Sequence, residues 1–160
     1  MNDKEKVYIG APAIDRLVAN VAECVVTLHN PCLWIILNGA FMFGADLMRR
    51  CEPAQVELLR VYRGYDVGRP HEPYFTVPRP TFLTKYTHVF VDVIAEEGKT
   101  LNFLKSLTST RYRKHVYTCA LIVKGTQYTP DIYGLRLHTN KFLTGYGMGP
   151  KRWLPYITEV

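Results

Sequence analysis

Apolar positions in the first third of the chain follow two different periods. Residues 11–28 space their apolar side chains as an amphipathic helix does, at Ile14, Leu17, Val18, Val21, Val25 and Leu28. Pro31 ends this pattern, because proline cannot continue a helix. Residues 33–37 are continuously apolar, which is typical of a strand buried on both faces of a parallel sheet. After Gly39 the helical pattern returns over residues 41–50, so the segment predicts the start of a βαβ unit.

The rest of the chain predicts further strands, one helix and one long connecting segment. We expect strands at residues 55–62, 88–94 and 116–123, a helix at 101–107, and short β segments at 131–137 and 142–146. Residues 63–80 contain glycines, prolines and two tyrosines, and a loop of this length is typically functional or mobile. We interpret it as a mobile arm or lid, with a strand near residues 74–77. Strands that alternate with helices predict an α/β fold with a mainly parallel sheet, in a single domain over residues 1–160.

Composition favours a globular protein with anionic partners. The chain has 160 residues, of which 48% are hydrophobic and 21% are charged. Its formal net charge of +6 would attract nucleotides, diphosphates or nucleic acid. The basic runs at 49–50, 111–114 and 151–152 are short, which is typical of solvated surface. Nucleic-acid binding through residues 111–114 is therefore a minor alternative, which strongly salt-dependent association would support.

Cysteine usage and hydropathy predict a soluble protein of the reducing cytoplasm. No cysteine pair has C-x-x-C spacing, and we expect buried or half-buried free thiols at Cys24, Cys32, Cys51 and Cys119. The polar start is followed by no sufficient apolar run, so no secretory signal is predicted. Residues 21–44 are apolar but too often interrupted by polar residues to span a bilayer.

The turn after the strand at residues 88–94 carries the most informative polar residues. Glycine lets the backbone curl so that its amides point inward, and the helix that follows adds its positive end. Gly98, Lys99 and Thr100 could therefore cradle a phosphate. Acids just before such a turn can hold sugar hydroxyls, organise Mg²⁺ or accept a proton. The alternative for this turn is an ordinary helix start.

Several segments, in order along nearly the whole chain, resemble the hypoxanthine-guanine phosphoribosyltransferases. Residues 37–47 read LNGAFMFGADL, close to that family's pyrophosphate loop and following helix. Residues 91–101 lie where the family has its loop for phosphoribosyl pyrophosphate (PRPP), and LIVK at 121–124 resembles the strand that ends in its purine-contacting lysine. The other matches are the opening at 7–10, the base-binding segments at 130–134 and 141–147, and the tail at 152–157. The resemblance implies a type I phosphoribosyltransferase fold, a mainly parallel central sheet flanked by helices, with a small hood.

The resemblance also implies a role for each matching position. Lys124 would donate to the exocyclic oxygen of a 6-oxopurine, Phe142 would stack on the base, and the backbone of Leu143 would read its edge. Glu96 would accept the proton, and Asp92 would hold the ribose or a metal ion. The 5′-phosphate would lie at Glu97, Gly98, Lys99 and Thr100, and the pyrophosphate near Asn38, Gly39 and Arg152. Mg²⁺ would bridge pyrophosphate and ribose, and a homo-oligomer is implied.

Taken singly, some of these residues have plainer interpretations. Phe142 could belong to the core, Lys124 could be a surface lysine, and Arg152 could form a surface cation–π pair with Trp153. Their order and their joint fit to one family favour the functional roles.

The departures from the family fall on the chemistry. Asp92 stands alone where the family has two adjacent acids, and Glu96-Glu97 replaces its Asp-Thr. A shift of one residue would instead match the Asp-Asp-Val-Ile-Ala of adenine-type relatives with one acid deleted. A carboxylate at Glu97 would repel a dianionic phosphate unless it turns to solvent or binds a metal. Asn38 replaces a basic residue, and Gly149 replaces an acid that helps to organise Mg²⁺.

Three hypotheses follow. The first is a divergent purine phosphoribosyltransferase, which makes a nucleoside monophosphate from PRPP and hypoxanthine, guanine or xanthine. The second is a catalytically impaired descendant that binds a nucleotide or a partner as a regulatory module, because losing one transition-state contact costs on the order of 10²–10³ in rate. The third is altered chemistry on the same scaffold, with another phosphorylated sugar or a modified base.

Overall fold

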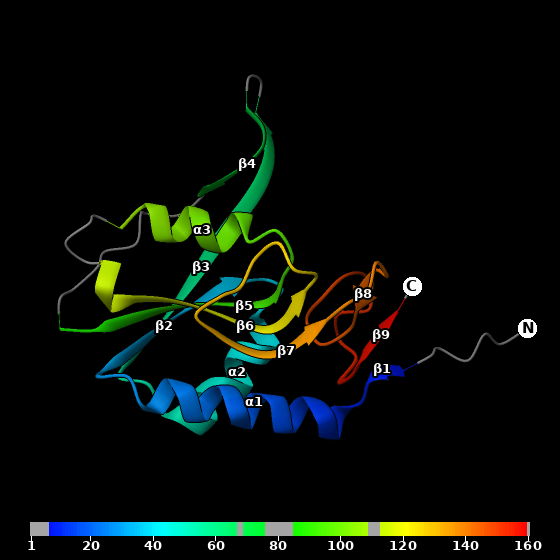
Figure 1. The fold of residues 1–160 in the computed structure, drawn as a ribbon, viewed down its shortest axis with the longest axis horizontal. Coiled ribbons are helices and arrows are strands. Elements are labelled where there is room, and N and C mark those ends of the chain that lie inside the picture. Colours follow the sequence, from blue (N-terminus) through cyan, green and yellow to red (C-terminus); the bar gives the residue numbers. More distant parts are fainter. Residues whose placement is uncertain (1–6, 67–68, 76–84, 109–112, 160) are drawn as a thin grey trace, which may run out of the picture.

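The computed structural model describes residues 7–66, 69–75, 85–108 and 113–159. Its centre is a six-stranded sheet in the order β4-β3-β2-β5-β6-β7 (Figure 1). Neighbours from β3 to β7 run parallel, and β4 is antiparallel to β3. The strands are β2 (Pro31–Leu37), β3 (Gln55–Asp66), β4 (Arg69–Phe75), β5 (Thr87–Ala95), β6 (Val116–Lys124) and β7 (Ile132–Leu137). The predicted α/β fold with a mainly parallel sheet is confirmed.

The strand order changes direction between β2 and β5. The chain passes from β2 outward to β3, whereas β5 returns to the other side of β2 and leads outward to β6 and β7. In open parallel sheets, ligands bind in the crevice at the carboxyl ends of the strands where the order reverses. A ligand is therefore expected beside the residues that follow Leu37 and Ala95.

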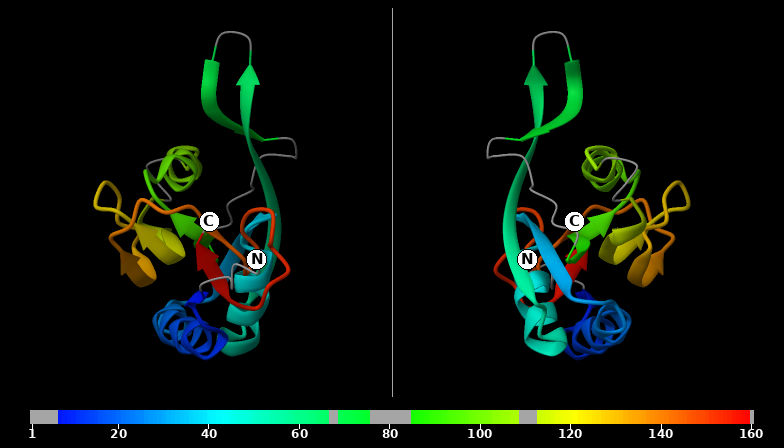
Figure 2. Two further views of the ribbon diagram at one scale, coloured as in Figure 1. Left: turned by 90° about the vertical axis from the view of Figure 1, so that its right-hand side faces the viewer. Right: turned by 90° about the vertical axis from the view of Figure 1, so that its left-hand side faces the viewer.

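Three α-helices of the described part cover the two faces of this sheet. α1 (Ala11–Val26) and α2 (Phe41–Cys51) pack on one face, and α3 (Lys99–Ser106) packs on the other (Figures 1 and 2). A single 3-10 turn, η1 (Arg113–His115), precedes β6. α1 ends two residues earlier than expected, because a tighter turn closes it, in which the Leu28 N–H donates to the Val25 carbonyl over 3.0 Å. α3 begins two residues earlier than expected, directly after Gly98.

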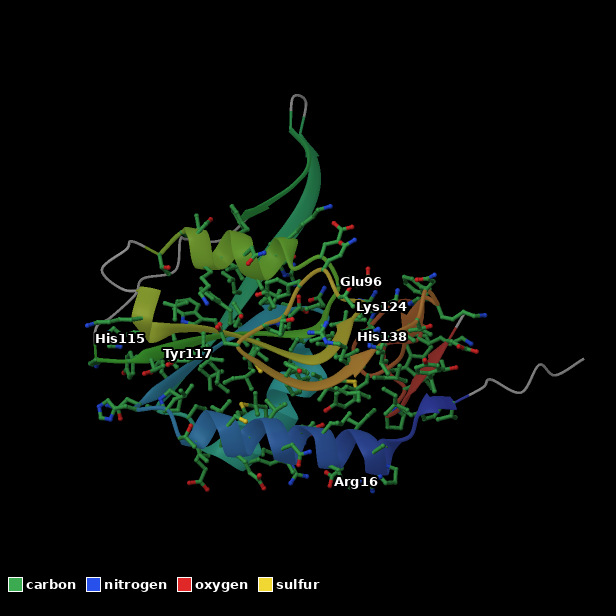
Figure 3. The ribbon with its side chains drawn as sticks, in the orientation of Figure 1. Arg16, Glu96, His115, Tyr117, Lys124 and His138 are labelled. Carbon is green, nitrogen blue, oxygen red and sulfur yellow. The ribbon has the colours of Figure 1, made fainter. Side chains whose placement is uncertain are left out.

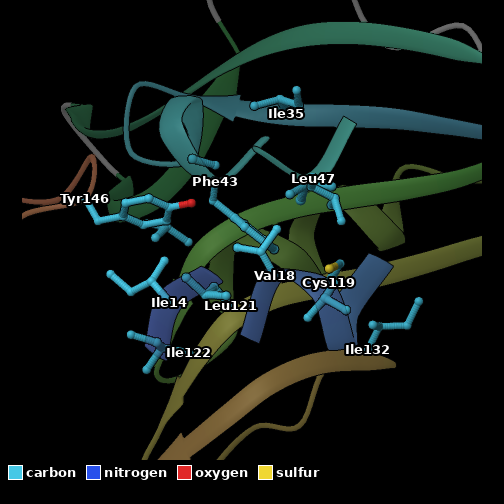
Figure 4. Close-up of a cluster of buried hydrophobic side chains, with 14 of the residues drawn as sticks. Ile14, Val18, Ile35, Phe43, Leu47, Cys119, Leu121, Ile122, Ile132 and Tyr146 are labelled. Carbon is cyan, nitrogen blue, oxygen red and sulfur yellow. The ribbon is translucent and has the colours of Figure 1, made fainter. Parts of the chain in front are cut away.

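The hydrophobic core lies on both faces of the sheet. Between the sheet and α1 and α2, side chains such as Val18, Phe43 and Leu121 are almost fully buried (Figure 4). A second cluster lies on the side of α3 and includes Trp34 and Phe90. There the Trp34 indole N–H donates to His88 Nδ1 over 2.9 Å. Burial on both faces explains why the central strands are mainly apolar.

A small second sheet joins the two ends of the described chain. Its strands are β1 (Val7–Ile9), β8 (Leu143–Thr144) and β9 (Ile157–Glu159), in the antiparallel order β1-β9-β8. The expected β segment at 142–146 is therefore shorter than predicted, and β9 was not predicted. The pairing brings the segment around Phe142 beside the main sheet.

The long segment after β3 forms a hairpin rather than an irregular loop. β3 continues to Asp66, four residues beyond its expected end, and pairs with β4 in a ribbon that projects away from the sheet (Figures 1 and 2). The strand expected near 74–77 is β4, which begins earlier, and residues 76–84 lie outside the described part. Movement of this arm over a ligand stays a prediction.

The cysteines are free, as expected, but one of them is exposed. Cys24 lies off the face of α1 that buries Val21 and Val25, whereas Cys32, Cys51 and Cys119 are buried. Burial raises the pKa of the Cys32 thiol to about 12 and that of Cys51 to about 11, so both stay protonated near neutral pH. Among the described residues, none of the helices has the length and apolar character needed to cross a membrane.

Candidate functional site

A pocket of about 540 Å³ opens at the carboxyl ends of β2 and β5, where the strand order reverses. Three groups of residues line it. The turn after β2 contributes Asn38 and Gly39. β5, the turn after it and the start of α3 contribute Asp92, Val93, Ile94, Glu96, Glu97 and Thr100, and the C-terminal segment contributes Phe142, Leu143, Gly149 and Arg152. The pocket thus unites nine of the twelve predicted site residues, all except Gly98, Lys99 and Lys124.

The C-terminal wall of the pocket is fixed to the rest of the fold. The Tyr146 hydroxyl donates to Asp46 of α2 over 2.5 Å, and burial together with this carboxylate raises the pKa of Tyr146 far above its usual value. Gly147 lies directly against the Gly39 carbonyl, where any side chain would overlap. Its N–H donates to the Arg152 carbonyl over 2.8 Å. The turn after β2 and the C-terminal segment therefore form one continuous wall.

Phe142 presents its ring to this pocket. Its side chain is 58% exposed, so the alternative that it belongs to the core is wrong. Ile94 of β5 lines the same pocket, and the backbone of Leu143 follows the aromatic residue. An exposed aromatic ring beside an aliphatic side chain is suited to stacking on a planar ligand.

Lys124 and Glu96 form an ion pair beside the pocket. The lysine Nζ lies 2.5 Å from Glu96 Oε1, and only 14% of the lysine side chain is exposed, so Lys124 is not an ordinary surface lysine (Figure 3). Lys124 borders a second, polar pocket of about 290 Å³, which shares Glu96 and Glu97 with the first. Glu96 lines both pockets and Lys124 lines the second, so the pair offers a hydrogen-bond donor and an acceptor side by side.

The turn at Gly98 connects β5 to α3. Gly98 has a φ of +70°, a conformation in which glycine avoids the strain that a side chain would bring. The amides of the first helical turn follow it, and Thr100 lines the pocket. Lys99 does not line the pocket; it pairs with Glu97, and both side chains are about half exposed, at 53% and 52%. Glu97 therefore turns to a lysine neighbour rather than only to solvent.

Asn38 and Arg152 also line a neighbouring apolar pocket of about 610 Å³, together with Phe41, Met42 and Leu58. The Arg152 Nε donates to the Gly149 carbonyl over 3.3 Å. Among the described residues that line this neighbouring pocket, Arg152 is the one cation and the others are neutral. This arrangement gives weaker attraction for a polyanion than a basic residue at position 38 would give.

The acids of the pocket fit Mg²⁺ only as an ion shared with a ligand. Within the described ranges, no three acidic, histidine or cysteine side chains converge as a metal site. Mg²⁺ usually takes one or two carboxylates and completes its shell with water and phosphate oxygens, which Asp92 permits. Gly149 offers no ligand, and a Cβ atom there would lie 2.8 Å from Thr144 Oγ1 and 3.2 Å from Phe142 Cε1. A side chain at position 149 would therefore press on Thr144 and Phe142.

Two residues that shape this site were not predicted from the sequence. Tyr146 lay in a segment that resembled the family, but its bond to Asp46, one hundred positions away, has no local signal. Tyr128 lies in the loop after β6, and its ring packs against Gly98. The signal in the sequence was its position two residues before Pro130-Asp131, which begins one of the segments that resemble the family.

Comparison with known proteins identifies the fold. No protein-family model matches the sequence, and no curated protein sequence matches it. Solved structures do match. Hypoxanthine phosphoribosyltransferase from Trypanosoma cruzi, in complex with the product IMP, is 20% identical with a TM-score of 0.81, and the match covers 100% of this chain and 96% of that one.

Two bacterial structures agree with this match. Hypoxanthine phosphoribosyltransferase from Staphylococcus aureus is 20% identical with a TM-score of 0.81, over 99% of this chain and 92% of that one. Hypoxanthine-guanine phosphoribosyltransferase from Bacillus anthracis is 21% identical with a TM-score of 0.77, over 98% of both chains. The chain therefore has the type I phosphoribosyltransferase fold that the sequence predicted.

Proposed function

We propose that this chain is a divergent purine phosphoribosyltransferase that transfers phosphoribose from PRPP to a 6-oxopurine. The observation that carries the proposal is the pocket at the carboxyl ends of β2 and β5. An exposed Phe142 ring and Glu96 line this pocket, and Lys124 and the Gly98 turn lie beside it, in a fold shared with hypoxanthine phosphoribosyltransferases. The residue roles proposed below are those that the resemblance implies, and this arrangement supports them.

The base would lie between Phe142 and Ile94. Stacking on an aromatic ring contributes about 1–3 kcal/mol per base and accepts any planar purine. The ammonium of Lys124 would donate to the exocyclic oxygen, and the backbone of Leu143 would face the base edge. An amino group in place of that oxygen would leave the largely buried ammonium without an acceptor, so adenine would be disfavoured.

The transfer breaks the bond between the ribose C1′ and the pyrophosphate oxygen and forms a bond from C1′ to a purine nitrogen. The proton of that nitrogen passes to the Glu96 carboxylate, and pyrophosphate leaves with the electron pair of the broken bond. In the structure Glu96 pairs with Lys124. The base would separate the two side chains, so that the lysine bonds the oxygen and the carboxylate is freed to accept the proton.

The remaining contacts would hold the phosphates and the ribose. The Gly98 turn with Lys99 and Thr100 would bind the 5′-phosphate through its amides and hydroxyl, with Glu97 beside it. Asn38, Gly39 and Arg152 would face the departing pyrophosphate. Asp92 would bind the ribose hydroxyls, or an Mg²⁺ ion that neutralises charge on the leaving group. A homo-oligomer in the cytoplasm is proposed with this function.

The test is direct. The protein, Mg²⁺ and PRPP are mixed with hypoxanthine, guanine, xanthine or adenine, and products are separated by chromatography. We expect a nucleoside monophosphate from at least one 6-oxopurine. Tyr133→Phe, an exposed change on β7, is the control that should leave the product yield unchanged.

A binding module without turnover is the second candidate. Lys99 and Lys124 are both paired with carboxylates. In addition, Asn38 stands where the family has a basic residue, and Gly149 stands where it has an acid. This candidate predicts that a nucleoside monophosphate binds while no base is converted. Isothermal titration with IMP, run beside the product assay, separates the two candidates.

A further inference from the structure

The ring of Tyr128 occupies the space that a side chain on Gly98 would need. A Cβ atom built on Gly98 would overlap the base of the ring and would lie 2.7 Å from its Cδ1 atom. Tyr128 comes from the loop between β6 and β7, whereas Gly98 comes from the turn between β5 and α3. The ring therefore sits flush against the backbone at the point where the chain turns into α3.

Tyr128 is itself held from two sides. Its hydroxyl donates to Thr118 Oγ1 over 3.1 Å, and Thr118 is a residue of β6 with only 1% of its surface exposed. The Arg136 guanidinium donates to the Gly125 carbonyl over 2.6 Å and to the Tyr128 carbonyl over 3.4 Å. The guanidinium also donates to Thr129 Oγ1 over 2.6 Å. These hydrogen bonds hold the loop that carries the ring in place.

The same loop also holds the other end of α3. Asp131 accepts from Lys105, in the last turn of α3, over 2.9 Å, and from the Thr118 N–H over 2.8 Å. Burial raises the pKa of Asp131, but the hydrogen bonds from Lys105 and Thr118 outweigh burial and hold that pKa below its usual value. α3 is therefore secured by Tyr128 at Gly98, the residue directly before its first turn, and by Asp131 at its last turn.

We propose that Tyr128 is a positioning residue for the phosphate group of the ligand. Gly98 has no side chain with which to fix its own left-handed turn, and the ring in contact with it restricts the turn to one conformation. The amides of the first turn of α3 then face the pocket before the ligand arrives, which lowers the entropy lost on binding. The ligand class is a phosphomonoester, and the inference rests on the proposed function in assigning the phosphate to this turn.

The test compares a nucleoside monophosphate with its nucleoside. Isothermal titration gives the affinities of IMP and inosine, and their ratio reports the contribution of the phosphate alone. In the unaltered protein we expect IMP to bind at least about tenfold more tightly, because charge-assisted bonds at a helix N-terminus are strong. Tyr128→Leu should lower this ratio about fivefold to tenfold while the inosine affinity stays the same. Tyr128→Phe, which keeps the ring, should retain most of the ratio.

The controls separate the possible failures. Tyr133→Phe, which removes only the hydroxyl of an exposed tyrosine of β7 and keeps the ring on which Arg136 lies, should leave the ratio unchanged. If Tyr128→Leu does not fold, Tyr128→Met makes the same test, because it also removes the ring that packs on Gly98. An unaltered protein that binds IMP no better than inosine would overturn both this inference and the proposed function. A large ratio that Tyr128→Leu leaves intact would overturn this inference alone.

Discussion

Glu97 places a carboxylate directly before the turn that we assign to the 5′-phosphate. It lines the main pocket and pairs with Lys99, and both side chains are about half exposed. A dianionic phosphate at the turn would meet this charge, and Lys99 is drawn toward Glu97 instead of toward the ligand. Replacing the carboxylate with its neutral amide, Glu97→Gln, removes the repulsion and leaves Lys99 available.

The magnitude follows from Coulomb's law. Two unit charges about 4 Å apart in water interact by about 1 kcal/mol, and a dianion doubles this to about 2 kcal/mol. The exposed Glu97–Lys99 pair that is lost contributes about 0–1 kcal/mol, and salt screens part of the remainder. We therefore expect Glu97→Gln to bind IMP roughly fivefold to thirtyfold more tightly, since about 1.4 kcal/mol is a factor of ten.

The assay is titration with IMP and with inosine at low and at high salt. The gain should be confined to IMP and should shrink as the salt concentration rises. Glu23→Gln, a matched change on the exposed side of α1, should alter neither affinity. Unchanged or weaker IMP binding by Glu97→Gln would refute the reasoning, because it would mean that the carboxylate does not face the phosphate or that it assists binding.

Three further predictions concern the base, the second metal position and pH. Phe142→Ala should weaken IMP binding at least about fivefold through lost stacking. The urea midpoint should change little, because the ring is exposed. Phe41→Ala, at an equally exposed phenylalanine, is the control, and an equal loss of IMP affinity in both variants would refute the assignment. Gly149→Asp should destabilise the fold by about 1–2 kcal/mol, because the Cβ of the new side chain would press on Thr144 and Phe142. For the same reason the variant should not bind Mg²⁺ more tightly. Tighter Mg²⁺ binding by titration would contradict this. The lowered pKa of Asp131 implies stabilisation that is present above about pH 4 and is lost as the pH falls through the native pKa. Asp131→Asn should therefore flatten the pH dependence of the free energy of unfolding, measured with urea between pH 5 and 2. An unchanged pH dependence in this variant would contradict the prediction.

The central elements of the fold could be predicted because their local patterns are strong. Residues 33–37 are continuously apolar and residues 88–94 are apolar except for His88 and Asp92, and both segments became strands that are largely buried on two faces. The start of α3 was placed too late because Lys99 and Thr100 are polar, and because Gly98 begins the helix through its backbone conformation rather than through a capping side chain. β9 was missed because its three residues gain their structure only by pairing with β1 and β8, far away in the sequence.

The candidate site could be predicted residue by residue but not as a set of partners. The resemblance selected Glu96 and Lys124 separately, and no local pattern relates two charges 28 positions apart that meet in an ion pair. It also selected Gly98 without Tyr128, because a loop residue that packs on a distant glycine leaves no periodic signal. Which pairs form depends on how β5, β6 and the C-terminal segment meet.

The most direct measurement is chromatography of the product formed from PRPP, Mg²⁺ and each purine base, by the unaltered protein and by Lys124→Ala. The account predicts a nucleoside monophosphate peak with at least one 6-oxopurine, and its loss in Lys124→Ala, because the largely buried ammonium is the proposed donor to the exocyclic oxygen. No product with any base from a folded protein would contradict the transferase assignment.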